Sequence, residues 1–405
     1  MPAKVATIKQ PGTFAVRLND FLVRENSSTE LTGRISAMVS EISKARTTID
    51  KKAADLRGAL GAPLADVEAG AGLGYFRRYK NGIVYVKPPG APCWVQGAIL
   101  GKYLELGAEG GNAGSIPAGV DLGYPTTDEL ATTGGEGRYT HFERGSIFWS
   151  YSSGAHEVHG AIRDKWASLG WEKSWLGYPI SDEQEYPDGG RISQFQNGWI
   201  YWWPDTGAIA LGPVTVRYKG LYCFGEQRGL GADKPYVVIG VTPVPPVQPF
   251  SARTQIYDDV DSGDSRPDDL ELYTGIAGGM ALGLVLWEHN SGDPDAYLGL
   301  VKQGAVLAGK GVAAACGTLL GAEAAPVCKE LWDEVAPTIV SFVNGLLDTG
   351  DNQLGLWARS ISAKDMVAMA TLPRTNFWGI EFHFESDLLS NGDVSYKAYF
   401  AIEPA

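Results

Sequence analysis

Aspartates gather in the second half of the chain, in short polar stretches next to apolar runs. Carboxylate oxygens from several neighbouring loops are the ligands that Ca²⁺ prefers, about six to eight at a time. The pattern is compatible with a calcium site, which makes calcium the candidate cofactor, but aspartate is also common in ordinary turns, and turn chemistry is the favoured interpretation. The candidate metal ligands are Asp233, Asp258, Asp259, Asp261, Asp293 and Asp295.

Aromatic residues are the second group that could do chemistry, because 12 Trp, 18 Tyr and 13 Phe are present and many lie between Tyr75 and Trp203. In the run Trp199 to Trp203, alternate side chains face opposite sides of a strand, so at least one ring should be exposed. An exposed ring can stack on a sugar, whereas a buried ring packs between successive hairpins. The candidate ligand-binding residues are Tyr151, Trp171, Trp175, Trp199, Trp202 and Trp203.

Two acidic pairs, Asp128-Glu129 and Asp182-Glu183, have the residue types of a glycosidase acid and nucleophile. They occupy equivalent places in two similar stretches, which favours a scaffold role, either capping a helix or bonding the amides of a Gly-Gly turn. His141, His156 and His159 could seed a metal site, but hydrogen bonding is favoured because no partner lies at metal-motif spacing. No catalytic triad, nucleophile elbow or P-loop occurs, and we expect no enzymatic activity.

The elements that must position these residues are repeated along the chain. Gly97-Ala98-Ile99 recurs as Gly160-Ala161-Ile162, and Leu122-Gly123-Tyr124-Pro125 recurs as Leu176-Gly177-Tyr178-Pro179. Each copy closes with an aromatic hairpin, over 142–149 and 195–202. A weaker first copy has Leu60-Gly61-Ala62-Pro63, a hairpin over 79–85 and an amphipathic helix over 30–56. We expect an N-terminal extension over 1–32, then three repeats of helix plus hairpin over 33–96, 97–159 and 160–212.

These motifs resemble the LGFP repeat family, which consists of tandem modules found in cell-wall proteins. The second and third copies carry Leu-Gly-Tyr-Pro, Asp-Glu, Gly-Gly and Phe-x-x-Gly-x-Ile-x-Trp in order, whereas the first copy lacks the Tyr and the Glu. The resemblance implies the fold of residues 33–212 and a role in positioning proteins on cell-envelope polysaccharide. It carries over no individual ligand residue.

After Pro213 the sequence changes to strand-like runs, which predict a β-sandwich over 213–405. The expected strands cover 214–224, 236–241, 252–257, 281–288, 376–384 and 395–402. Stretches rich in Ala, Val and Leu over 295–320 and 325–347 predict an inserted helical pair. The fold class is therefore mainly β with helices (α+β): tandem helix-plus-hairpin repeats, then a sandwich that resembles uncharacterised domains accompanying LGFP repeats.

Charge and hydropathy exclude several classes of partner. The formal net charge of −13 repels phosphate backbones, so we expect no nucleic-acid partner. No long uninterrupted apolar stretch occurs, which predicts a soluble chain. The first residues hold no apolar run and predict no signal peptide, which leaves the cytoplasm, non-classical secretion and the cell wall open. Cys316 and Cys328, twelve residues apart, could pair.

We predict a non-catalytic protein whose repeats recognise a cell-surface or cell-wall glycan and whose sandwich supplies a second contact, with calcium as its candidate cofactor. The first alternative is a secreted toxin or effector whose helical insertion over 295–347 acts on membranes. A gathering of Asp at strand ends is similar to calcium-dependent membrane-targeting sandwiches, so peripheral membrane contact also stays open. The second alternative is a hydrolase with its site at the Asp258 and Asp261 loop.

Overall fold

The computed structural model describes residues 28–108, 120–225, 233–244, 250–290 and 352–405. The chain divides into two compact units, Met1–Gln184 with Ser193–Ile200 and Glu185–Ile192 with Tyr201–Ala405, and the division falls inside the third repeat. Three predictions lie outside the described residues: the helical pair over 295–347, the Cys316 and Cys328 pairing, and the ligands Asp293 and Asp295. Among the described helices, none combines the length and the apolar character needed to cross a membrane.

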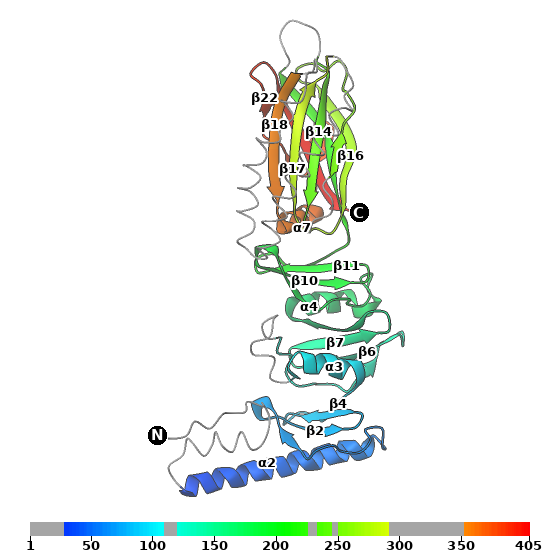
Figure 1. Cartoon of the computed structure of the whole chain (residues 1–405), viewed down its shortest axis with the longest axis vertical. Coiled ribbons are helices and arrows are strands. Elements are labelled where there is room, and N and C mark those ends of the chain that lie inside the picture. Colours follow the sequence, from blue (N-terminus) through cyan, green and yellow to red (C-terminus); the bar gives the residue numbers. More distant parts are fainter. Residues whose placement is uncertain (1–27, 109–119, 226–232, 245–249, 291–351) are drawn as a thin grey trace. The chain divides into compact units, whose positions relative to one another are not determined.

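Each repeat contains a four-stranded sheet whose strands follow chain order (Figure 1). The predicted hairpins are the central strands of these sheets. The first sheet consists of β1 (Glu68–Ala69), β2 (Tyr75–Tyr79), β3 (Gly82–Val86) and β4 (Cys93–Val95). The second consists of β5 (Leu130–Ala131), β6 (Gly137–His141), β7 (Gly145–Ser150) and β8 (Gly154–His159). The third consists of β9 (Gln184–Tyr186), β10 (Gly190–Phe195), β11 (Gly198–Trp203) and β12 (Gly207–Leu211).

A helix precedes each sheet: α2 (Ser28–Asp55), α3 (Gly97–Glu105) and α4 (Gly160–Leu169). The helix predicted over 30–56 is confirmed as α2. The chain turns from a strand straight into α3 and into α4, and the first residues of these helices, Gly97 and Gly160, have φ of 56° and 50°. Only glycine adopts this left-handed conformation at little cost, which explains why both copies of the Gly-Ala-Ile motif begin with it.

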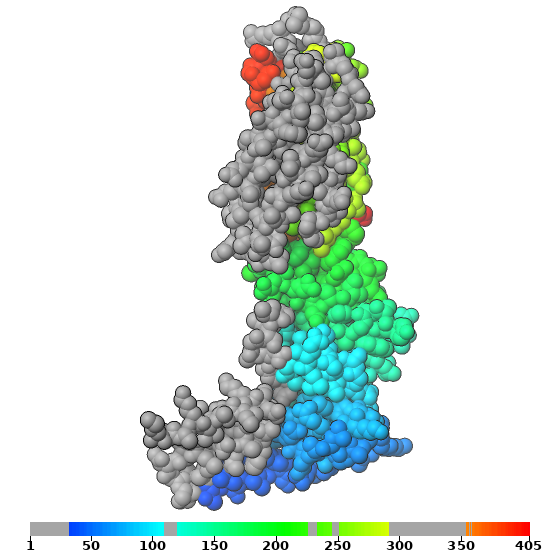
Figure 2. Space-filling model, in the orientation of Figure 1, coloured from blue at the N-terminus to red at the C-terminus, as the bar shows by residue number. Residues whose placement is uncertain are grey.

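Aromatic side chains on the helices connect one sheet to the next. Tyr103 of α3 is fully buried, with its ring centroid 5.5 Å from that of Tyr85 in the first sheet and 4.5 Å from that of Phe142 in the second repeat. Figure 2 shows the first repeat and α3, coloured blue to cyan, as one continuous surface. Since a single small sheet cannot bury its own apolar face, the helix and the next sheet cover it.

The same arrangement recurs one repeat later with larger rings. Trp166 of α4 is fully buried, 4.5 Å from Phe148 of β7 and 5.2 Å from Phe195 of β10 between ring centroids. In β11, Tyr201 is the counterpart of Phe148, and there the loop after β16 (Ser265–Gly275) contacts the hydroxyl of the ring. The Ala277 amide donates to the Tyr201 hydroxyl at 3.3 Å. The core therefore continues through residues that the repeat pattern does not contain.

Two antiparallel sheets form the predicted sandwich. One has the order β16-β13-β23-β21 with β22 also paired to β23, and the other has the order β15-β14-β17-β18. The ring of Trp357 in β18 stacks at 5.6 Å on that of Phe400 in β23, which joins the sheets. The other elements of this region are β13 (Val214–Gly225), β14 (Pro235–Pro243), β15 (Phe250–Arg253), β17 (Met280–Glu288), β18 (Asn352–Ile361), α7 (Ala363–Thr371), β21 (Phe384–Glu385), β22 (Leu389–Ser390) and β23 (Ser395–Pro404).

Four predicted strands, 214–224, 236–241, 281–288 and 395–402, are confirmed within β13, β14, β17 and β23. The run 252–257 is wrong beyond its first two residues, because β15 ends at Arg253. The run 376–384 is also wrong as one strand: a tight turn divides it into β19 (Thr375–Phe377) and β20 (Ile380–Phe382), and its last residue, Phe384, begins β21.

The sequence patterns missed β16, β18 and α7. Strand β16 contains Pro267 and several carboxylates, which are typical of loops. Proline is tolerated in a strand at the edge of a sheet, where no second neighbour needs its N–H, and β16 pairs with β13 at that edge. The local sequence is therefore typical of a loop, but the segment forms a strand because it pairs with β13 at the edge of the sheet.

Replacing Trp166 with Ala should lower the free energy of unfolding by about 3–5 kcal/mol, because the change leaves a large cavity between two sheets. Urea denaturation of the full chain measures this loss. The matched control is Tyr151→Ala, which removes a ring that is 93% exposed and should leave stability nearly unchanged. Equal effects of the two variants would contradict the assignment of Trp166 to the core.

Candidate functional site

The aspartate of each Asp-Glu pair fastens its repeat to the preceding one. Asp128 accepts a hydrogen bond from the Trp94 amide of β4 at 2.8 Å, and Lys52 of α2 pairs with the same carboxylate. Neither a helix cap nor a Gly-Gly turn is the partner, so the predicted scaffold role is correct in kind but wrong in its contacts. Residue types suited to a glycosidase therefore hold two repeats together.

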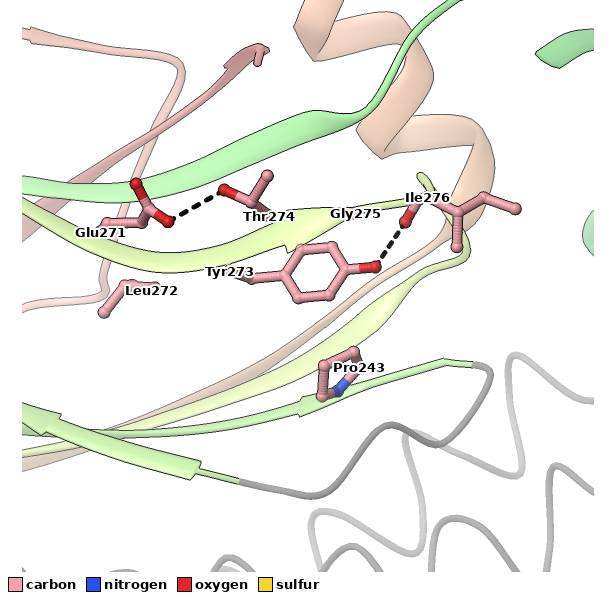
Figure 3. A pocket seen from close by; sticks show the side chains of 7 residues that line it. All are labelled: Pro243, Glu271, Leu272, Tyr273, Thr274, Gly275 and Ile276. Carbon is pink, nitrogen blue, oxygen red and sulfur yellow. Dashed lines mark hydrogen bonds between the residues drawn. The ribbon is translucent and has the colours of Figure 1, made fainter. Parts of the chain in front are cut away.

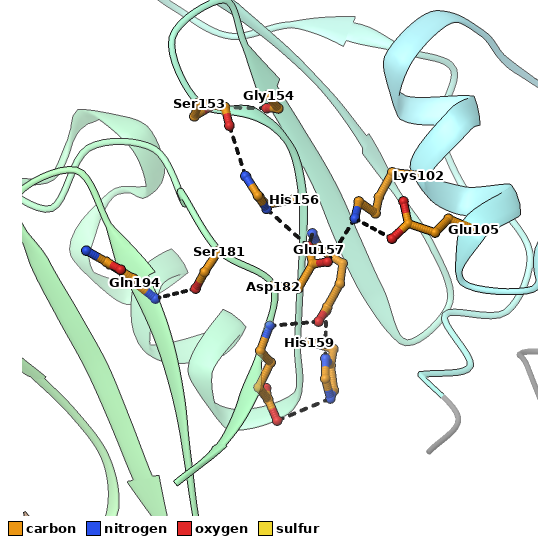
Figure 4. A network of polar contacts seen from close by, with 11 residues as sticks. Lys102, Glu105, Ser153, Gly154, His156, Glu157, His159, Ser181, Asp182 and Gln194 are labelled. Carbon is orange, nitrogen blue, oxygen red and sulfur yellow. Dashed lines mark hydrogen bonds and ion pairs between the residues drawn. The ribbon is translucent and has the colours of Figure 1, made fainter. Parts of the chain in front are cut away.

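The equivalent contacts recur at the second junction, where more groups take part (Figure 4). Asp182 accepts from the Glu157 amide of β8 at 3.1 Å and pairs with Lys102 of α3 at 2.8 Å. The His156 ring lies between the Asp182 carboxylate, at 3.2 Å, and the Ser153 carbonyl, at 2.9 Å. This network therefore fixes the turn between β7 and β8, which contains Ser153.

A fully buried carboxylate lies beside this network. Glu157 is 0% exposed, accepts from the Glu183 amide at 3.0 Å and contacts Nδ1 of His159 at 2.8 Å. Nε2 of His159 lies 3.4 Å from the Glu183 carboxylate. Throughout the described ranges, no group of three or more His, Cys, Asp or Glu side chains is placed to hold a metal ion. His156 and His159 thus contribute hydrogen bonds to the junction.

Each Leu-Gly turn is closed in the same way. A side chain from the aromatic hairpin donates a hydrogen bond to the carbonyl of the residue just before the Leu, at 2.8 to 2.9 Å. These bonds show which residues are equivalent in the three repeats, and the donor–acceptor pairs are Asn81 with Ala59, Arg144 with Asp121, and Asn197 with Trp175.

The first junction is charged at this position. Lys87 pairs with Glu143 at 2.7 Å, and Arg144 pairs with the Asp121 carboxylate at 2.5 Å. Ion pairs of this kind occupy the hydrogen-bonding groups of the turn. At the first junction, these charged side chains are therefore already paired with one another.

The second junction replaces these charges with neutral and aromatic groups. The Gln196 amide donates to the Ser152 hydroxyl at 3.3 Å, and the Asn197 amide donates to the Trp175 carbonyl at 2.9 Å. Tyr151, next to Ser152, is 93% exposed, and Trp175 is 49% exposed. We call Tyr151, Ser152, Trp175, Gln196 and Asn197 the aromatic face. Exposed rings beside amides and a hydroxyl suit a ligand with an apolar surface and a hydroxylated edge.

The other aromatic residues that were predicted to bind a ligand lie elsewhere. Trp171 is partly buried: its ring stacks on Phe148 at 5.5 Å, and the guanidinium of Arg163 lies 5.3 Å from its centroid. Trp203 is 1% exposed and donates from Nε1 to the Pro187 carbonyl at 3.0 Å. Trp199 and Trp202 are partly exposed in β11. Of the six candidates, Trp175 is bonded through its carbonyl to Asn197, and Tyr151 is the neighbour in sequence of Ser152, which is bonded to Gln196.

The predicted metal ligands are dispersed among different contacts. Asp233 is 4% exposed, and its carboxylate accepts from the Tyr396 hydroxyl at 2.6 Å. Asp258, Asp259 and Asp261 are exposed in the loop before β16, where the Arg266 side chain donates to the Asp259 carbonyl at 2.5 Å. The calcium site stays a prediction, since these contacts fasten turns and neither require a cation nor exclude one.

The second unit has an open groove of about 470 Å³ at the end of β16 (Figure 3). The hydroxyl of Tyr273 donates to the Ile276 carbonyl at 2.9 Å, and that of Thr274 donates to Glu271 at 3.1 Å. Polar groups of the groove therefore bind one another. We assign no ligand to it.

Sequence reasoning missed Ser152, Gln196 and Asn197 as part of a site. A signal for two of them was present, because the hairpin turn reads Glu143-Arg144 in one copy and Gln196-Asn197 in the next. The change from charged to neutral residues within one repeated motif marks a position that the scaffold leaves free to vary.

Comparison with known families agrees with this geometry. The LGFP repeat family matches three segments, residues 60–111, 122–174 and 176–221, which confirms the resemblance drawn from the motifs. Each matched segment begins at the Leu of a Leu-Gly turn. The repeats predicted from the sequence are divided at the helices instead, so the two divisions start at different points of the same repeating unit. No curated protein matches the chain.

Replacing Asp182 with Asn tests the junction through its pH dependence. Burial raises the pKa of Asp182, but hydrogen bonds from His156, Lys102 and the Glu157 amide outweigh it and lower the pKa from 3.8 to about 2. The ionised carboxylate therefore stabilises the fold by about 2 kcal/mol at pH 7. Because the pKa of the folded state is lowered, this stabilisation is present above about pH 4 and is lost as the pH falls toward 2.

Urea denaturation at several pH values should show wild type and Asp182→Asn differing at pH 7 and converging near pH 2. The control is Asp66→Asn, which changes the equivalent residue of the first repeat. Asp66 is 61% exposed at its side chain and pairs with Arg46 of α2. Its loss should cost less than about 1 kcal/mol. A pH-independent difference for Asp182→Asn would refute the role of its charge.

Proposed function

Residues 60–221 of this chain are three LGFP repeats, which are cell-wall-associated repeat domains, and from this premise we propose that the chain is a non-catalytic protein that binds a neutral glycan of the cell envelope. The aromatic face is the observation that carries the proposal. Its two exposed rings lie beside neutral hydrogen-bonding groups, Gln196, Asn197 and Ser152, at one repeat junction.

A sugar ring matches this surface chemically. Its C–H face is apolar and stacks on an aromatic ring, while its hydroxyls exchange hydrogen bonds with amides and with other hydroxyls. The equivalent position of the first junction is occupied by the ion pairs of Lys87 with Glu143 and of Arg144 with Asp121, which would have to be broken to bind the same ligand. We therefore assign glycan binding to the second junction rather than to every repeat.

Two other predictions, calcium binding by the sandwich and membrane activity of the helical insertion, do not depend on the aromatic face. Calcium at the Asp258, Asp259 and Asp261 loop would give the sandwich a second contact, and equilibrium dialysis with ⁴⁵Ca²⁺ tests that prediction directly. A membrane-active toxin would depend on residues 295–347, which lie outside the described residues. The proposal assigns no catalytic step to the repeats.

A printed array of neutral and anionic oligosaccharides, probed with the full chain, tests the proposal. Wild type should bind neutral oligosaccharides, and Tyr151→Ala and Trp175→Ala should each weaken that binding about fivefold, since a stacked ring contributes about 1 kcal/mol. Both rings are exposed, so neither change should unfold the chain.

The matched control is Asp121→Ala, because Asp121 is the counterpart of Trp175 at the first junction. This variant should bind the array as wild type does. Unchanged binding by both ring variants, or an equal loss in Asp121→Ala, would refute the assignment to the aromatic face.

A further inference from the structure

A tryptophan occupies a strained position at the tip of a hairpin in the second unit. Strands β19 and β20 pair with Phe377 opposite Ile380, which leaves Trp378 and Gly379 as a two-residue turn. Both residues have positive φ, 49° and 85°, as in a type I′ turn. Asn, Asp or Gly normally fills the first position of this turn, because a larger side chain there costs conformational free energy.

Packing does not repay this cost, since Trp378 is 68% exposed. Its ring lies 6.5 Å from that of Phe377 and 6.4 Å from that of Tyr222 between centroids. Phe224, at 4.7 Å from Tyr222, is itself 44% exposed. We call Tyr222, Phe224, Phe377 and Trp378 the hairpin platform. Strain that is kept at an exposed aromatic cluster points to a binding function.

Polar groups, and charged groups of both signs, border the hairpin platform. The Ser262 hydroxyl donates to the Phe224 carbonyl at 3.2 Å, and the Gly263 amide donates to the neighbouring Cys223 carbonyl at 2.8 Å, so this loop lies against the platform. Just after this loop, at the start of β16, Arg266 pairs with Asp264 at 2.8 Å. Charged and polar groups thus lie at the edge of an aromatic surface, and the guanidinium of Arg266 has five N–H donors to share among its partners.

The charged groups near the hairpin platform disfavour charged ligands and favour a neutral one. An anionic lipid surface is repelled by the exposed Asp258, Asp259 and Asp261 and by the net charge of −13. A cationic peptide would meet Arg266 at the same edge. A neutral sugar has an apolar face for the rings and hydroxyls that both donate to carboxylates and accept from a guanidinium.

We propose that the hairpin platform is a second saccharide-binding site, which takes a neutral sugar ring stacked on Trp378. It goes beyond glycan binding by the repeats, because it lies on the sandwich and uses none of the residues of the aromatic face. The site also needs no metal ion. Its central residue is Trp378, whose strained backbone is retained for the sake of the exposed ring.

The test uses the full chain carrying Tyr151→Ala and Trp175→Ala, which removes the aromatic face. This double variant should still bind a subset of the neutral oligosaccharides on the printed array. Adding Trp378→Asn should weaken that residual binding about fivefold or more, because the stacked ring is lost. The melting temperature should not fall, since Asn is favoured in the turn.

Two further variants sharpen the test. Trp378→Phe keeps a ring and should retain most of the residual binding. Leu372→Asn removes another apolar side chain of this unit, 60% exposed, and should leave the binding unchanged.

Several results would overturn the inference while the proposed function stands: no residual binding by the double variant, residual binding unaffected by Trp378→Asn, or a lower melting temperature for Trp378→Asn. Co-sedimentation with phosphatidylcholine vesicles that Trp378→Asn abolishes, with array binding unchanged, would assign the platform to membrane contact instead and also overturn it. If wild type binds no oligosaccharide on the array, both this site and glycan binding by the repeats are refuted.

Discussion

Burial of one aromatic side chain between two sheets is the constraint on which the repeats depend. Each four-stranded sheet has an apolar face that it cannot cover alone, and Tyr103 and Trp166 fill the space to the next sheet. At β11 the loop around Ala277 takes part, because its amide donates to the hydroxyl of the buried Tyr201. The repeats are therefore not independent modules, since the stability of each one is shared with whatever covers its sheet.

The polar contacts at the junctions follow from this close approach, and they explain why the first copy departs from the motif. Tyr124 donates to the Ala71 carbonyl of the preceding repeat at 2.7 Å, and the Tyr178 hydroxyl meets that of Thr132 at 2.8 Å. A Cβ at Gly74 would lie 2.0 Å from the Tyr124 ring, so glycine is required there. The first copy has Ala62 in place of this tyrosine, and the family match begins with that copy. Atypical first and last repeats are common in repeat proteins.

Because buried rings and Asp-Lys pairs hold the junctions, the outer residues of each Leu-Gly turn are free to differ. One junction carries ion pairs at this position, whereas the other carries Tyr151, Trp175 and two amides on the same backbone. In the second unit, Trp378 is likewise an outer residue that the packed scaffold does not need, since its ring adds little to packing and its backbone conformation is unfavourable. In both units the binding surfaces that we propose lie on turns supported by a well-packed scaffold.

The sequence by itself determined the repeated motifs, helix α2, the aromatic hairpins and the α+β class, because these follow from local periodicity and turn chemistry. Tertiary structure alone decided which rings face solvent. Trp175 and Trp203 are the same residue type in adjacent motifs, yet one is 49% exposed and the other 1%, because burial depends on packing partners that local sequence does not reveal. For the same reason only the structure separated β19 from β20 at Trp378, made the proline-containing β16 an edge strand, and brought Asp182 to the Glu157 amide of the preceding repeat.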